Sequence, residues 1–137
     1  MGVVIDSTVL IAAEREGKNP RGLVQEVAGV CGDTEAILSV VTVVELAHGI
    51  ERADSAKRRI TRERFIEVLL NEIPVEPITV AIAFRAGRLD GRLQTMGLRI
   101  ALGDLLIGTT ALELGYAVLT HNIRHFQMIP GLTVMQL

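Results

Sequence analysis

The run Val3-Val4-Ile5-Asp6 near the amino terminus places the strongest constraint on how this chain can fold. Three β-branched apolar residues in succession are typical of a strand buried on both faces, as in a parallel sheet covered by helices. Ligands of open α/β sheets bind in the crevice outside the carboxyl ends of the strands. Asp6 ends this run and is therefore predicted to lie at such a carboxyl end. A simpler interpretation is that Asp6, Ser7 or Thr8 caps the next helix. The run therefore predicts a parallel sheet and makes Asp6 a candidate functional residue.

The rest of the chain alternates between segments with strand patterns and segments with helix patterns. Short apolar runs bounded by turn residues predict further strands at residues 36–39, 75–76, 117–120 and 132–134. Apolar residues at helical spacing, with proline and glycine near the segment ends, predict helices at residues 9–16, 20–32, 42–51, 54–73, 79–97 and 105–114. This alternation predicts a three-layer α/β fold with a mostly parallel central sheet, and 137 residues suit a single domain.

The composition excludes several classes of protein. Aromatic residues make up only 3% of a chain that is 49% hydrophobic, so the core must be aliphatic. The single cysteine, Cys31, excludes an internal disulfide and suits a reducing cytoplasm. No apolar stretch reaches the length of a membrane span, and the amino terminus lacks the basic region of a signal peptide. We therefore expect a cytoplasmic protein with no membrane partner.

Three acidic residues, Asp6, Glu45 and Asp104, each stand beside apolar sequence at the start of a predicted helix. Each has a structural explanation, because Thr42 and Glu45 match a capping box and either aspartate can cap its own helix. However, the strands before Asp6 and Glu45 are predicted to be sheet neighbours, and the helix that Asp104 opens leads into another strand. This arrangement would bring all three carboxylates to one edge. Clustered carboxylates repel one another unless a cation lies among them, and hard oxygen ligands select Mg²⁺ or Mn²⁺. The acids therefore predict a metal site.

Four segments resemble the PIN-domain ribonucleases and, more narrowly, the VapC-type toxins of bacterial toxin–antitoxin pairs. They are VIDSTVLI at residues 4–11, SVVTVVELAHGI at 39–50, GDLLIGTTA at 103–111 and LTHNIRHF at 119–126. The segments follow the order of the family and span the chain, so the resemblance implies a single PIN domain over residues 1–137. It also implies that Asp6, Glu45 and Asp104 bind Mg²⁺ or Mn²⁺ and that a metal-activated water hydrolyses single-stranded RNA.

The fourth segment departs from the family pattern. Such toxins often read Thr-x-Asn-x-x-Asp-Phe there, whereas this chain has Asn122 and His125 and no acid. An amide oxygen is a neutral ligand, so we expect Asn122 to contribute to the site while metal binds weakly to the free protein. The hydroxyl groups of Ser7, Thr8 and Thr120 either orient the acidic ligands, touch phosphate, or only cap helices.

Arginine supplies 12 of the 14 basic residues, although the formal net charge is only −2. Arg85, Arg88 and Arg92 share one face of a predicted helix, where they could follow an RNA backbone or pair with Asp90 or a partner's carboxylates. A second basic run is interpreted as a solvated helix face and consists of Lys57, Arg58, Arg59, Arg62 and Arg64. The three histidines have no zinc spacing and are expected at the surface or behind the metal ligands; they are His48, His121 and His125.

We expect a homodimer bound to an antitoxin whose peptide covers the acidic cleft, because the first helices and the helix at 54–73 carry much apolar surface. Two other functions stay open. The residues around Asp6 also resemble the first motif of haloacid-dehalogenase-like phosphatases, but Thr8 replaces their second aspartate and no lysine is well placed. A PIN-like protein that binds RNA or a partner without cutting would account for the missing fourth acid. A metal-dependent ribonuclease assay separates the three functions.

Overall fold

The computed structural model describes residues 1–137 and is built around a five-stranded sheet. The strands are β1 (Gly2–Ile5), β2 (Glu35–Ser39), β3 (Val75–Glu76), β4 (Ala117–Leu119) and β5 (Val134–Met135). Their order in the sheet is β3-β2-β1-β4-β5, and every neighbouring pair is parallel. The predicted α/β class is confirmed, and the sheet expected to be mostly parallel is parallel throughout.

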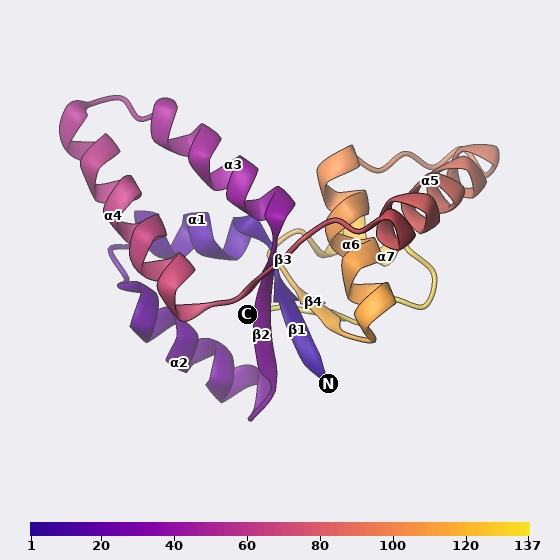
Figure 1. Cartoon of the computed structure of the whole chain (residues 1–137), viewed down its shortest axis with the longest axis horizontal. Coiled ribbons are helices and arrows are strands. Elements are labelled where there is room, and N and C mark those ends of the chain that lie inside the picture. Colours follow the sequence, from indigo (N-terminus) through magenta and orange to yellow (C-terminus); the bar gives the residue numbers. More distant parts are fainter.

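Seven helices flank the sheet in two groups (Figure 1). They are α1 (Ser7–Arg15), α2 (Pro20–Cys31), α3 (Val40–Glu51), α4 (Ala56–Glu72), α5 (Val80–Thr95), α6 (Leu102–Leu114) and α7 (Ile123–Gln127). Helices α1 to α4 lie on one side of the sheet and α5 to α7 on the other, which gives the three predicted layers. None of the helices combines the length and apolar character that crossing a membrane requires.

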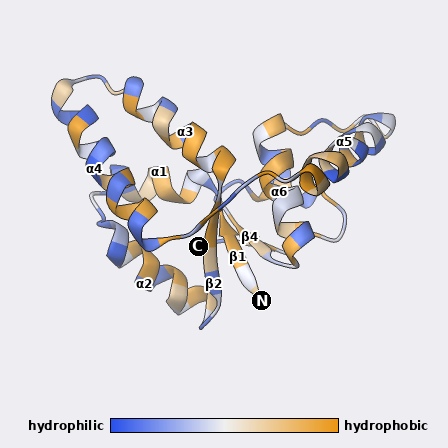
Figure 2. Cartoon of the chain, in the orientation of Figure 1, coloured by the Kyte–Doolittle hydropathy of each residue, from blue (hydrophilic) through white to orange (hydrophobic).

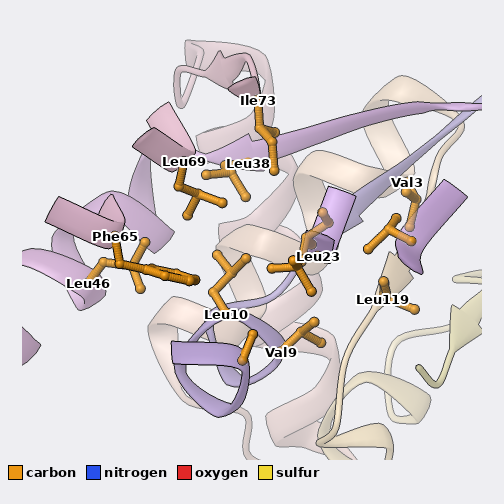
Figure 3. Close-up of a cluster of buried hydrophobic side chains, with 13 residues drawn as sticks. Val3, Val9, Leu10, Leu23, Leu38, Leu46, Phe65, Leu69, Ile73 and Leu119 are labelled. Carbon is orange, nitrogen blue, oxygen red and sulfur yellow. The ribbon is translucent and has the colours of Figure 1, made fainter. Parts of the chain in front are cut away.

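Strand β1 lies at the centre of the sheet, between β2 and β4. Its side chains alternate between the two faces, as strand geometry requires. Val3 and Ile5 belong to the larger core under α1 to α4, which also contains Leu10, Phe65 and Leu69 (Figure 3). Val4 points into the smaller core under α6 and α7. Burial on both faces explains the unbroken apolar run, and it confirms the interpretation of this segment.

The helix starts differ from the predicted capping box. Helix α3 begins at Val40, because Ser39 at the end of β2 caps it and accepts a hydrogen bond from the Val41 backbone N–H at 3.1 Å. Thr42 and Glu45 consequently lie inside the helix, so the capping interpretation of this pair is wrong. Helix α6 also begins earlier than predicted, with Asp104 in its first turn and no side-chain cap. Neither Glu45 nor Asp104 is therefore used as a helix cap.

Two other segments were incompletely predicted. Helix α7 was not expected, because its five residues are too few to show helical periodicity. Strand β5 lies at Val134–Met135 rather than at 132–134. By contrast, Gly115 ends α6 as expected, with a φ of 70° that favours glycine.

Candidate active site

The predicted site residues gather at the carboxyl edge of the sheet. Asp6 follows β1, and Thr120 follows its parallel neighbour β4, where Ile5 is in register with Leu119. Glu45 lies on α3, which begins directly after β2, the other neighbour of β1. Asp104 lies in the first turn of α6. The sheet order therefore brings together segments that are far apart in the sequence, and we call this region the acidic cleft.

Asp6 is held by two hydroxyl groups. Its Oδ2 atom accepts hydrogen bonds from Thr8 Oγ1 at 2.7 Å and from Thr120 Oγ1 at 2.8 Å. The side chain makes no cap to its own helix, and the residue is only 1% exposed. Burial of a carboxylate is tolerated when hydrogen bonds compensate it, so these hydroxyl groups account for an acid in this position.

Backbone N–H groups complete this network and set its direction. The His121 N–H donates to Thr8 Oγ1 at 3.1 Å, and the Asn122 N–H donates to Thr120 Oγ1 at 2.8 Å. Each hydroxyl therefore accepts from the backbone and donates its hydrogen to Asp6. The structure thus supports an orienting role for Thr8 and Thr120, and the Asp6 Oδ1 atom has no hydrogen-bond partner in the chain.

Glu45 is the least satisfied acid of the cleft. Its Oε1 atom is buried and has no hydrogen-bond partner, and the same is true of Oγ1 of Thr42 one turn earlier. Burial raises the pKa of the Glu45 carboxyl, and the charges of Asp6 and Asp104 raise it further. A hydrogen bond from Ser7 acts in the opposite direction and lowers this pKa. Glu45 is therefore a partly desolvated carboxylate that lies within the field of two others.

Asp104 contacts His125, which was expected at the surface or behind the metal ligands and was not counted among the catalytic residues. His125 Nδ1 lies 2.9 Å from Asp104 Oδ2 and 2.7 Å from the side-chain amide of Asn122. One ring nitrogen cannot donate to Asp104 and also accept an N–H from Asn122. A donating Nδ1–H requires the Asn122 amide to present its oxygen. His125 occupies the position where the family pattern often has its fourth acid, and that departure was the one signal that could have identified it.

The donor set fits a divalent cation. Asp6 Oδ1 and Glu45 Oε1 lack partners, Asp104 is nearby, and such hard oxygen donors suit Mg²⁺ or Mn²⁺. As they stand, no three aspartate, glutamate, histidine or cysteine side chains are close enough together to enclose an ion. The predicted convergence is correct at the level of the backbone, and the side chains do not form a finished coordination shell.

Other charged residues named from the sequence lie in different surroundings. Lys18 is held by Glu16 and Glu26, each at 3.1 Å, and Lys57 lies in the first turn of α4. The lysine that a haloacid-dehalogenase-like phosphatase needs is thus missing from the contacts of Asp6. His48 and His121 are exposed. The arginines of α5 line a separate groove.

Comparison with known proteins agrees with this geometry. Residues 3–131 match the family model of the PIN domain. Ribonuclease VapC1 of Rickettsia felis is 30% identical over 135 residues, which cover 98% of this chain and 96% of the relative.

Two solved structures have the same fold. The crystal structure of VapBC2 from Rickettsia felis bound to a promoter DNA fragment has a TM-score of 0.84 and 20% identity, covering 99% of this chain and 98% of that one. VapBC-5 of Mycobacterium tuberculosis, a member of the VapBC family of toxin–antitoxin systems, has a TM-score of 0.75 and 23% identity, with both chains fully covered. The match to the family model over almost the whole chain and the likeness to a named ribonuclease lead to one conclusion: this protein belongs to the PIN-domain family of nucleases, as a relative of the VapC ribonucleases.

Proposed function

We propose that this protein is a Mg²⁺- or Mn²⁺-dependent endoribonuclease that cuts single-stranded RNA as the toxin of a toxin–antitoxin pair. The observation that supports the metal site best is the buried, unpartnered Glu45 Oε1 in the field of Asp6 and Asp104. An orphaned buried carboxylate oxygen is costly in a folded protein. A cation among the three acids would remove that cost.

Each residue of the cleft has a distinct task in this proposal. Asp6, Glu45 and Asp104 hold the ion, whose chemistry is to activate water and to neutralise charge on phosphate oxygens. Thr8 and Thr120 keep the Asp6 carboxylate in one orientation. His125 contacts the Asp104 side chain and Asn122 contacts His125, so this pair would hold Asp104 in place.

An antitoxin is the proposed protein partner, because the similar solved structures are VapBC assemblies. A pocket of about 70 Å³ between α1, α3 and α4 offers an anchor point for an apolar side chain of such a partner. Its apolar lining consists of Leu10, Ile11, Leu46, Phe65 and Ile66. The acidic cleft would receive a more polar part of the same peptide, as expected from the sequence.

A homodimer is also part of the proposal, with a different surface from the one first expected. The most exposed apolar side chains are not on α1, α2 or α4. They include Val44 of α3 at 66% exposure, Val80 of α5 at 86% and Leu102 of α6 at 69%. Figure 2 shows hydrophobic residues along much of α3, while α4 is largely hydrophilic. Apolar side chains of this size on a small protein favour self-association through α3, α5 and α6.

The deciding experiment compares the wild type with the Asp104→Asn variant on single-stranded RNA, with and without Mg²⁺ or Mn²⁺. We expect cleavage only by the wild type and only with metal. Cleavage that is equal in chelator and in metal would contradict the metal mechanism. RNA binding without cleavage by the wild type would favour the non-cutting alternative, and a phosphoaspartyl adduct on Asp6 would favour the phosphatase.

The toxin role is tested in cells. We expect expression of the wild type alone to arrest growth, and co-expression of a small protein encoded beside it to relieve the arrest. Normal growth with abundant folded protein would contradict the toxin role. A cytoplasmic location stays a prediction, in keeping with the free thiol of Cys31.

A further inference from the structure

A groove of about 330 Å³ is formed by α5, α6 and the segment that follows α7. Three arginines line it together with Phe84, Met96 and Pro130; they are Arg85, Arg88 and Arg92. No acidic residue lines this arginine groove, and none of its residues belongs to the acidic cleft. It is therefore a second polar surface that the proposed cleavage chemistry does not use.

Most of the positive charge in the arginine groove has no partner within the chain. Arg85 pairs with Glu113 at 3.0 Å, but Arg88 and Arg92 form no ion pair. Asp90, the acid considered as their partner from the sequence, instead accepts a hydrogen bond from Gln94 at 3.1 Å. Two guanidinium groups are consequently available to an anionic ligand.

The arginines form a row rather than a single anion site. Steps of three and four residues correspond to about 4.5 Å and about 6 Å along the α5 axis. Guanidinium groups bind phosphate oxygens bidentately, so a row of them suits a chain of phosphates. A single small anion would contact only part of this row.

An exposed aromatic ring accompanies the row. Phe84 is 68% exposed and Met96 is 59% exposed, although both line the groove. The chain has only three phenylalanines, and the other two, Phe65 and Phe126, are buried. Aromatic rings beside cationic side chains are the usual elements of surfaces that bind single-stranded nucleic acid, because bases stack on the rings.

We propose that the arginine groove binds single-stranded RNA outside the cleavage site, with Arg88 and Arg92 on phosphates and Phe84 stacked on a base. This inference rests on the proposed function, since RNA is the substrate proposed there. An acidic peptide would satisfy the arginines but would leave the Phe84 ring without a role. A second copy of the chain packed symmetrically on this groove would bring two rows of arginines together, which like-charge repulsion disfavours.

The test measures RNA affinity of the full-length chain over a series of salt concentrations. All variants carry Asp104→Asn, so that bound RNA stays intact. In this background we compare Arg88→Gln/Arg92→Gln with Arg58→Gln/Arg64→Gln, which removes the same charge from two unpaired arginines of α4 that line no pocket. The salt slope is the slope of the logarithm of the RNA binding constant against the logarithm of salt concentration. Losing two phosphate contacts lowers the magnitude of this slope by roughly 1.4, at about 0.7 for each contact to a single strand. We expect this change in the α5 pair and not in the α4 pair.

A second comparison tests stacking without changing charge. Phe84→Ala is expected to weaken RNA binding roughly fivefold or more, because base–aromatic stacking contributes at least about 1 kcal/mol. Ile60→Ala is the control, since Ile60 of α4 is an exposed apolar residue that lines none of the pockets and is not part of the proposed dimer surface. Thermal melting of each variant confirms that its fold is retained.

Several results would overturn the inference. One is an equal loss of salt slope in the α4 and α5 pairs. Another is competition by polyglutamate that matches competition by RNA of the same charge, which would indicate an acidic protein partner. A shift from dimer to monomer in Arg88→Gln/Arg92→Gln would indicate a contact between copies. The proposed function is judged separately: if the wild type cuts no RNA but the α5 arginines still govern RNA binding, the nuclease proposal fails and the groove stands.

Discussion

The two sides of the acidic cleft differ in how completely their polar groups are satisfied. On one side, Asp6 is buried and receives hydrogen bonds from Thr8 and Thr120, which the backbone in turn holds in place. On the other side, His125 contacts Asp104, and the Asp104 and His125 side chains are 16% and 48% exposed. One half of the cleft is thus built into the core, and the other half is open to solvent.

This difference indicates how a single chain could combine stability with the metal binding proposed for the cleft. On the Asp6 side, both threonine hydroxyl groups accept from the backbone and donate to Asp6 Oδ2, which fixes the orientation of this carboxylate. Glu45, between the two sides, keeps one buried oxygen without a partner. A cation would contribute most where the protein has left groups unsatisfied, so the strongest response to metal is expected at Glu45 and Asp104 rather than at the threonines.

The largest expected effect is on catalysis. Asp104→Asn and Asp6→Asn should each lower the rate of RNA cleavage by about a hundredfold or more, because each removes a charged metal ligand. Only Asp6→Asn should also lower the thermal midpoint strongly, since its carboxylate is bound by two hydroxyl groups in the core. Cleavage rates and thermal melting are measured together. Equal destabilisation by the two substitutions would remove the distinction between the rigid and open sides.

The next effect concerns the hydroxyl network. Thr120→Val removes a donor to Asp6 and leaves the Asn122 N–H without its acceptor, so we expect the free energy of unfolding to fall by about 1–3 kcal/mol. Thr120→Ser keeps the hydroxyl group and should lose much less. Denaturant unfolding measures both variants. A Thr120→Val variant as stable as the wild type would contradict the role of the hydroxyl group.

A smaller effect is expected at Asn122, which contacts His125 at the position where the family's fourth acid is absent. Asn122→Asp adds a negative charge to the cleft, and we expect Mg²⁺ or Mn²⁺ to bind roughly tenfold more tightly. This is the size of effect that one additional charge produces at an effective dielectric constant near 20, once the cost of desolvating the charge is subtracted. Asn122→Ala should instead slow RNA cleavage. Calorimetry without RNA gives the metal affinity. Unchanged affinity and rate in both variants would place Asn122 outside the site.

The smallest effect concerns Glu45 and pH. The pKa of Glu45 is raised in the folded protein, so ionisation of this carboxyl destabilises the fold. The free energy of unfolding is therefore highest below the ordinary pKa of a glutamate and falls as pH rises through the raised pKa. Glu45→Gln, which cannot ionise, should therefore melt a few degrees higher than the wild type at pH 7 in chelator, and this advantage should vanish in acid. Mg²⁺ should stabilise the wild type more than the variant. A variant that is less stable at every pH would contradict this prediction.

Much of the fold was predictable because its signals are local. The apolar run of β1, the glycine that ends α6 and the order of strands and helices all depend on neighbouring residues in the chain. The start of α3 was mispredicted because two capping solutions compete within a few residues. Ser39 prevails since it ends β2, where the chain already has the extended conformation that a cap requires.

The sequence by itself determined the α/β class, the family and the three candidate acids, because these depend on local patterns and on the order of motifs. Only the tertiary structure decided what each acid contacts. Thr120 reaches Asp6 across 114 positions of sequence, and His125 reaches Asp104 across 21. The structure likewise separated two basic helices that look alike in sequence, because only the arginines of α5 line a groove with an exposed aromatic ring. Such pairings depend on parallel strand register and helix packing, which bring distant side chains together in ways that neighbouring residues do not encode.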